Sequence, residues 1–338
     1  MSIVSKINTF ENAKNNNMEK KLKKIQHLFD NDFTKEYRCI EYIKSSGFTT
    51  LHHLVMLTKE HLEIENIIEE YLIEYPKEIN KQNMKGWTAL HLAVANLITL
   101  STINTVKILI KYGSNINEIT YDGCTPLFFA AKFGKTNVAA FLMSKGAVPN
   151  ISNIYGYSPL HVSILNIELI NTLRMIQLLI NNNIDINAVT NEGYTVLHLL
   201  AQNTNLSKSI IKLLLRHNIN FNAQCKHGNT ALHYLVKQNT RNKIKIIEEL
   251  LHANANINIQ NNKKMLPLHI LVKHGDNKYN ICLIKKLIDA GADTSITTAD
   301  GSNVMHLAIN HTREKLNKII NILTPIVNIN DTDGKGRT

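Results

Sequence analysis

Histidines are the residues of this 338-residue chain that could most readily do chemistry, because an imidazole can act as a general base or bind a metal. Seven of the fifteen follow Leu or Met in a recurring motif: His52, His91, His161, His198, His233, His269 and His306. Zinc sites and catalytic pairs need further ligands at short spacing, such as His-Glu-x-x-His or Cys-x-x-Cys. Neither pattern occurs. The sequence therefore predicts no catalytic residue, no metal and no cofactor, and the chain is not expected to be an enzyme.

The spacing of these histidines points to the elements that hold them. Successive copies of the motif start 33 to 39 residues apart, and most place a Gly, then Thr or Ser, before the Leu-His pair. A repeat of this length predicts stacked helical units with no single central core. Gly suits a hairpin tip with positive φ, and the hydroxyl residue caps the helix that follows. We expect the repeat histidines to be structural, together with Gly86, Gly123, Gly156, Gly193, Gly228 and Gly301.

One repeat carries a nearly complete family signature. It reads Asp122-Gly123-Cys124-Thr125-Pro126-Leu127 and continues through Ala130-Ala131, Phe141-Leu142 and Gly146-Ala147. In these residues the chain resembles the ankyrin repeat family. The resemblance implies an all-α solenoid of helix-turn-helix repeats with short β-hairpin tips. Eight repeats would occupy residues 47–330. Residues inserted between the paired helices, as in 96–101 and 166–171, resemble the lengthened repeats of large DNA viruses, of the mimivirus or poxvirus type.

Both ends depart from the repeat pattern. Residues 1–46 have Leu22, Ile25 and Leu28 at helical spacing and are expected to cap the first repeat, or alternatively to recruit a partner. Residues 331–338 reproduce the start of a truncated ninth repeat. Apolar residues are expected near that end: Ile319, Ile320, Ile322, Leu323 and Ile326. A continuing array is favoured there over a partner that covers this end.

The resemblance also implies where a partner protein binds, because ankyrin proteins usually use the concave side, with its variable hairpin residues and first-helix ends. Carried over by position, the candidates are Trp87, Tyr121, Asp122, Phe133, Tyr155, Tyr157, Glu192, Tyr194, Lys226, His227, Lys237, Lys263 and Lys273. Trp and Tyr are frequent interface anchors. Each aromatic residue has an alternative interpretation, which is packing against the next hairpin.

The charge of the chain is uneven. Its formal net charge is +11, and residues 225–295 hold eleven Lys or Arg against five Asp or Glu. An acidic protein partner, a nucleic acid and a solvated basic face are all compatible with this excess. Aromatic residues that could stack on bases do not alternate with the lysines, which disfavours nucleic acid.

A non-enzymatic protein-binding scaffold or adaptor is therefore the predicted function. The alternatives are a substrate receptor for a ubiquitin ligase, which needs a recruiting module such as the F-box-like segment of poxvirus ankyrin proteins, and nucleic-acid binding. No stretch is apolar enough to span a membrane, and the four cysteines are widely separated. We expect an intracellular, cytoplasmic protein, in the host cytoplasm if it is viral, with a protein partner and no membrane or small-molecule ligand.

Overall fold

A computed structural model describes residues 47–56, 62–95, 102–165, 172–203, 207–238, 240, 242–274, 278–309, 313–328 and 330–338. These residues form α-helices and one 3-10 turn at Pro76–Glu78, and they contain no β-strand. The all-α prediction is confirmed. The expected capping segment 1–46 and the insertions 96–101 and 166–171 lie outside the described residues. The chain forms two compact units, which we call the N-terminal region (to Ile154) and the C-terminal region (from Tyr155).

The described residues of the N-terminal region form three helix pairs. Its inner helices, which follow the hairpins directly, are α4 (Thr50–Met56), α6 (Ala89–Ala95) and α8 (Pro126–Lys132). Its outer helices are α5 (Leu62–Glu74), α7 (Thr102–Lys111) and α9 (Thr136–Ser144). Each inner helix packs on its own outer helix, and α6 packs on both α4 and α8, so the pairs form consecutive layers.

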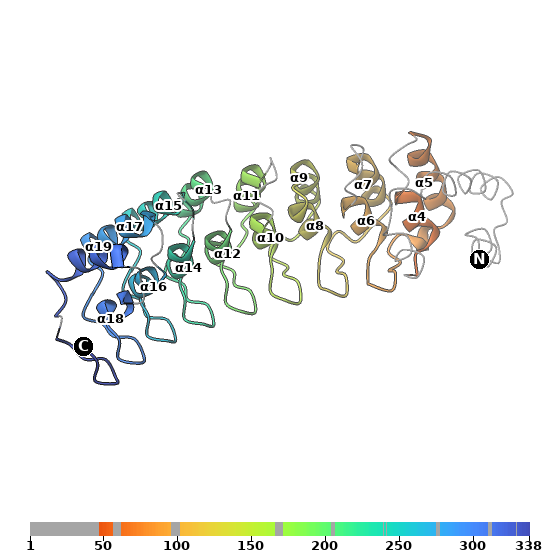
Figure 1. Ribbon diagram of the computed structural model, residues 1–338. Coiled ribbons are helices and arrows are strands. Elements are labelled where there is room, and N and C mark those ends of the chain that lie inside the picture. The colour runs from red at the N-terminus through yellow and green to blue at the C-terminus, as the bar shows by residue number, and fades with distance from the viewer. Residues whose placement is uncertain are drawn as a thin grey trace. The chain divides into compact units, whose positions relative to one another are not determined.

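The C-terminal region contains five further pairs of the same design. Its inner helices are α10 (Pro159–Leu165), α12 (Val196–Gln202), α14 (Ala231–Lys237), α16 (Pro267–Lys273) and α18 (Val304–Ala308). Its outer helices are α11 (Thr172–Asn181), α13 (Lys208–Leu215), α15 (Asn242–His252), α17 (Lys278–Asp289) and α19 (Arg313–Leu323). Within each region, the hairpins project beyond the inner helices, on the side away from the outer helices (Figure 1).

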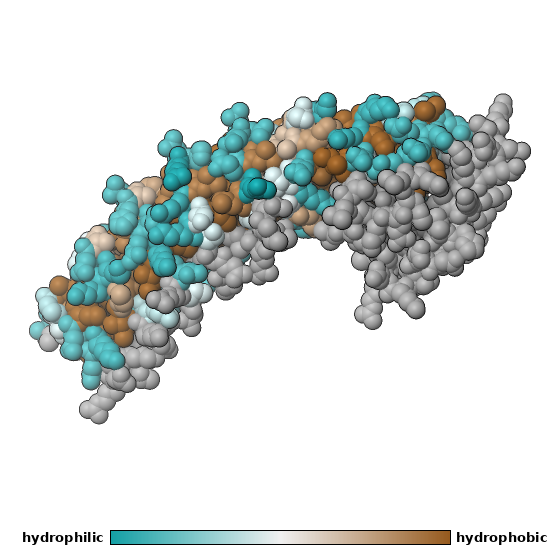
Figure 2. All heavy atoms as spheres, turned by 90° about the horizontal axis from the view of Figure 1, so that it is seen from above, coloured by the Kyte–Doolittle hydropathy of each residue, from teal (hydrophilic) through white to brown (hydrophobic). Residues whose placement is uncertain are grey.

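Apolar side chains at fixed positions build the core between the layers. The Leu of each motif is buried, as in Leu90, Leu127 and Leu232, and outer helices bury residues spaced like Ile246 and Leu250. Burying one such side chain contributes about 1.5–3 kcal/mol. The outer-helix side shows hydrophilic groups projecting among apolar surface (Figure 2).

A buried lysine caps the C-terminal end of one inner helix. Lys243, at the start of α15, is fully buried and its Nζ donates to the carbonyl of Val236 at 3.2 Å, to that of Gln238 and to Asn280 Oδ1 at 2.6 Å. The two carbonyls lie at the end of α14, where helical partners are missing. Burial lowers the pKa of Lys243 to about 8.

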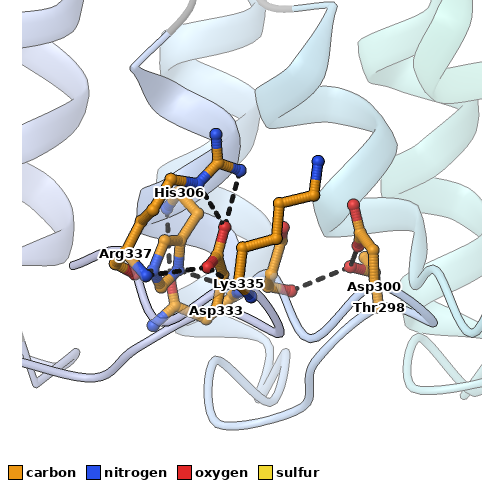
Figure 3. A network of polar contacts seen from close by, with 8 residues as sticks. Thr298, Asp300, His306, Asp333, Lys335 and Arg337 are labelled. Atoms are coloured by element: carbon orange, nitrogen blue, oxygen red, sulfur yellow. Dashed lines mark hydrogen bonds and ion pairs between the residues drawn. The ribbon is translucent and has the colours of Figure 1, made fainter.

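The last eight residues form a hairpin. Asp333 accepts hydrogen bonds from the backbone N–H groups of Lys335 and Arg337 at 2.8 and 2.9 Å, and from the Arg337 guanidinium (Figure 3). The hydrogen bonds from Arg337 lower the pKa of Asp333. Of the apolar residues expected near this end, Ile319 and Leu323 are buried, whereas Ile326 is exposed.

Candidate partner-binding surfaces

Each repeat histidine makes hydrogen bonds with both ring nitrogens. In the second repeat, the Thr88 N–H donates to His91 Nδ1 at 3.1 Å, and Nε2 lies 3.0 Å from the Glu118 carbonyl and 3.1 Å from the Cys124 carbonyl. A nitrogen that accepts an N–H carries no proton, and one that faces a carbonyl must carry it. The ring is therefore the neutral Nε2–H tautomer. The same arrangement recurs at His52, His161, His198, His233 and His269. Both ring nitrogens of His306 are also engaged, but its Nδ1 lies 2.6 Å from Asn303 Oδ1, an oxygen that only accepts.

These bonds tie each histidine to the next repeat. Burial lowers the pKa of His91 and of His233 to about 4. Burial also lowers the pKa values of His52, His161, His198 and His269. A ring whose two nitrogens are both engaged offers neither to a metal or a substrate.

The glycine hairpins are joined by one backbone hydrogen bond per step. The Tyr121 N–H donates to the Lys85 carbonyl at 3.0 Å, and the Ile154 N–H donates to the Asp122 carbonyl at 3.0 Å. In the C-terminal region the corresponding donors are the N–H groups of Asn191, Lys226, Asn262, Ala299 and Gly334. Gly86 has φ +76°, and a Cβ there would lie 2.6 Å from the Tyr121 nitrogen. The tips are thus held by backbone contacts, and their side chains can vary.

The seventh repeat keeps this hairpin without glycine. Lys264 stands in the glycine position and adopts φ +53°. Asn261 Oδ1 accepts the N–H groups of Lys263 at 2.9 Å and Met265 at 3.0 Å, as Asn83 does in the second repeat. The side chain of Asn261 therefore fixes the turn in which glycine is replaced.

Apolar side chains occupy the hairpin tips of the N-terminal region. Met84, Tyr121 and Ile154 are 69%, 67% and 53% exposed, and Asp122 beside Tyr121 is also exposed. Trp87 is only half-buried, and its ring packs on Phe129 with centroids 4.4 Å apart. Phe133 stacks on the other side of this cluster, 6.3 Å from Phe129. Trp87 and Phe133 thus belong to an aromatic cluster with a partly open surface.

Tyrosines distinguish the first hairpins of the C-terminal region. Tyr155 is exposed, whereas Tyr157 and Tyr194 are half-buried and contact the histidine of their own repeat. Tyr194 also meets Tyr234 of α14 with ring centroids 6.0 Å apart. Tyr234 was missing from the predicted surface, because it follows the Leu-His pair at a position whose residue is buried in half of the repeats, as at Val162 and Leu199.

Cations occupy the later hairpins and helix ends of the same region. Lys226, His227 and Lys263 lie at hairpin tips, and Lys237 and Lys273 end α14 and α16; all five are exposed. Glu192 is exposed on the preceding hairpin, with its carboxylate 3.4 Å from Lys226 Nζ. The predicted charged residues are therefore accessible and lie on the hairpins and inner helices.

Comparison with known families decides the identity of the fold. A model of ankyrin repeats matches residues 12–120, 98–190 and 167–261, which together exceed half of the chain. The chain belongs to the ankyrin repeat family.

Ankyrin proteins of a large DNA virus are among its relatives. The chain is 34% identical over 175 residues to ankyrin repeat protein L86 of Acanthamoeba polyphaga mimivirus, covering 46% of this chain and 30% of L86. It is 39% identical over 92 residues to the mouse nuclear factor NF-kappa-B p105 subunit, covering 27% of this chain and 9% of that protein. The chain thus spans less than a third of either relative. The predicted resemblance to viral ankyrin proteins is confirmed.

A solved ankyrin structure has the same fold. The crystal structure of the ankyrin repeat domain of Bcl-3 superposes with a TM-score of 0.57 at 24% identity and covers 71% of this chain and 99% of that domain. At this identity, the likeness extends to the fold alone.

Membership of the ankyrin family does not by itself imply a metal-binding or catalytic site in the described residues. Among those residues, no group of three His, Cys, Asp or Glu side chains could hold a metal ion. Cys124 and Cys225 are buried thiols and Cys282 is an exposed one. No helix in the described ranges is long and apolar enough to cross a membrane. Within this chain, the exposed residues of the hairpin tips differ from repeat to repeat.

Proposed function

We propose that this ankyrin repeat protein is a non-enzymatic scaffold or adaptor that binds a partner protein through its hairpin tips and inner-helix ends. One observation carries the proposal. Equivalent tips are held by the same backbone hydrogen bonds, yet their exposed side chains differ from repeat to repeat. Variable side chains on a constant frame are what a recognition surface requires.

The exposed tyrosines Tyr121 and Tyr155 are the proposed anchors, because each presents more than half of its side-chain surface to solvent. Large aromatic side chains lose little conformational entropy on binding and often contribute more than about 2 kcal/mol to an interface. Trp87 is a poorer probe of binding than its residue type suggests, because its packing on Phe129 also stabilises the fold.

Capture of proteins from the cells in which the protein occurs tests the proposal. Tyr121→Ala combined with Tyr155→Ala should abolish recovery of a specific partner. The matched control is Ile73→Ala with Leu173→Ala, which removes exposed apolar side chains from outer helices α5 and α11. Recovery unaffected by the tyrosine changes, or lost equally in the control, contradicts the proposed surface.

The ubiquitin-ligase receptor stays a prediction, since it requires a recruiting module and the described ankyrin repeats do not constitute one. Nucleic-acid binding is an outcome of the experiment given below.

A further inference from the structure

The hairpin side of repeats 6 and 7 carries cations without acidic residues. Segments 224–238 and 260–274 contain no Asp or Glu, and their exposed lysines are Lys226, Lys237, Lys263, Lys264 and Lys273. The acidic residues described between positions 207 and 289 all lie on outer helices α15 and α17: Glu248, Glu249 and Asp289. Charge is therefore segregated by side in this part of the chain.

Ion pairs reinforce this segregation. On the outer helices, Glu249 lies 2.9 Å from Lys208 Nζ, and Glu248 lies 2.6 Å from Lys286 Nζ. On the hairpin side, Lys226 has Glu192 at 3.4 Å. Within the described residues, no acidic side chain pairs with Lys237, Lys263 or Lys273. Ion pairs thus partly neutralise the lysines of the outer helices, whereas Lys237, Lys263 and Lys273 on the hairpin side keep their positive charge.

The lysines form two rows on one side. Lys226 and Lys263 belong to adjacent hairpins, which are joined by the Asn262 N–H to the His227 carbonyl at 3.1 Å. Lys237 and Lys273 are the last residues of α14 and α16, which pack on each other. The two rows are therefore a hairpin row and a helix-end row.

Tyr234 shows that both rows face the same way. It precedes Lys237 by three residues, so the two side chains share a face of α14. Its ring contacts Tyr194, and its hydroxyl accepts from Asn229 Nδ2 at 3.4 Å, both residues being in hairpins. Lys237 therefore projects toward the hairpin side.

We infer that these lysines form a basic strip (Lys226, Lys237, Lys263, Lys264 and Lys273) that binds an acidic segment of the partner protein, with Asp or Glu carboxylates against both rows. The inference rests on the proposed scaffold function and names the chemistry of its partner. Unneutralised surface charge raises the local concentration of an oppositely charged segment and selects against basic ones.

Two features favour an acidic polypeptide over nucleic acid. The strip contains lysines and no arginine, the residue suited to bidentate phosphate recognition. Tyr234, which shares a face of α14 with Lys237, is packed edge-on against Tyr194 and His198 with interplanar angles of 74° and 77°. A ring held in this way is not a platform for stacking bases.

Fluorescence anisotropy with a labelled peptide of alternating Glu and Ala tests the inference on the full chain at about 50 mM salt, where charge contacts are strongest. Lys237→Glu with Lys273→Glu reverses the helix-end row. The matched control, Lys245→Glu with Lys285→Glu, changes charge equally at exposed positions of outer helices α15 and α17. We expect affinity to fall by at least about tenfold in the first variant and by less than about twofold in the second.

Three results would overturn the inference: equal losses in both variants, equal binding of a Gln-Ala peptide, or no peptide binding alongside lysine-dependent binding of a single-stranded oligonucleotide. Unchanged circular dichroism and melting of both variants confirm that folding is preserved. The scaffold proposal fails separately, since it depends on the loss of captured protein in the Tyr121 and Tyr155 variant. If the peptide experiment fails but partner capture succeeds, the inference about the basic strip is refuted and the scaffold proposal stands.

Discussion

The hairpin tips of the two regions share one backbone and differ in chemistry. Two residues before the positive-φ position, the hairpins at Gly86, Gly123 and Gly156 have apolar Met84, Tyr121 and Ile154. The later hairpins of the C-terminal region have polar, charged or small residues there: Asn191, Lys226, Asn262 and Ala299. A backbone hydrogen bond joins the tips at each of these steps, and only some side chains add to it, such as Asn262 Nδ2, which donates to the Lys226 carbonyl at 2.9 Å. The comparison suggests one shared frame that presents two different recognition surfaces.

The shared frame should be sensitive to acid in both regions, which is the largest effect we expect. His91 in the N-terminal region and His233 in the C-terminal region have pKa values of about 4, against 6.5 in the unfolded chain. Between these values the unfolded state binds more protons, so the free energy of unfolding falls as pH falls. At pH 5 each histidine should cost about 2 kcal/mol relative to pH 7.

Denaturant unfolding at pH 7 and pH 5 measures this loss, and the His91→Gln and His233→Gln variants should each show a weaker dependence on pH. Equal stability at the two pH values would contradict the claim that buried histidines make both regions sensitive to acid. Loss confined to one region would show that the frames differ.

A single glycine replacement should destabilise its region by no more than the two histidines together. Gly86 and Gly228 have φ +76° and +71°, and a Cβ would lie 2.6 Å from the next hairpin's nitrogen at each. Gly86→Ala and Gly228→Ala should each cost roughly 2–4 kcal/mol. Gly146 has φ +94° with nothing within 4 Å, so Gly146→Ala should cost only about 1–2 kcal/mol. Equal unfolding midpoints for all three variants would refute the role of the close hairpin contact.

Two lysines at corresponding positions of α9 and α15 allow a finer contrast. Burial lowers the pKa of both Lys135 and Lys243 to about 8, but Lys135 is half-buried and Lys243 is fully buried. Lys243→Met should cost about 1–3 kcal/mol, because it leaves carbonyls at the end of α14 without a donor. Lys135→Met should cost less, since its side chain retains contact with water. Thermal melts of the two variants compare the effects, and a larger loss for Lys135→Met would contradict this account.

Changes at the apolar tips should have the smallest effect on folding. Met84→Ser with Tyr121→Ser alters side chains that are 69% and 67% exposed, so the free energy of unfolding should change by less than about 0.5 kcal/mol. Urea unfolding measures it. A loss of several times that size would mean that these tips stabilise the frame, and the separation between frame and recognition surface would not hold.

The sequence was sufficient to predict the repeat frame, because each motif position meets a local structural need. Gly adopts positive φ at the hairpin tip, the hydroxyl residue caps the helix, and the Leu of the Leu-His pair is buried. Lys264 shows where local rules stop: glycine is absent, yet the turn forms because Asn261 accepts two backbone N–H groups. Residue type alone did not indicate that Asn261 would hold the turn without a glycine, although Asn83 makes the same hydrogen bonds in the second repeat.

The surface was less predictable than the frame. Position identified the exposed tips, but it could not tell that Trp87 packs on Phe129 or that Tyr234 joins Tyr194, since both depend on the neighbouring repeat. The burial of Lys243 gave no sequence signal, because its acceptors are backbone carbonyls and an asparagine of the next repeat.

Partner capture tests the central claim most directly. The full chain should recover a specific protein from its native cells, and Tyr121→Ala with Tyr155→Ala should lose that protein while Ile73→Ala with Leu173→Ala retains it. Retention of the same protein by both variants would contradict the assignment of recognition to the hairpin tips.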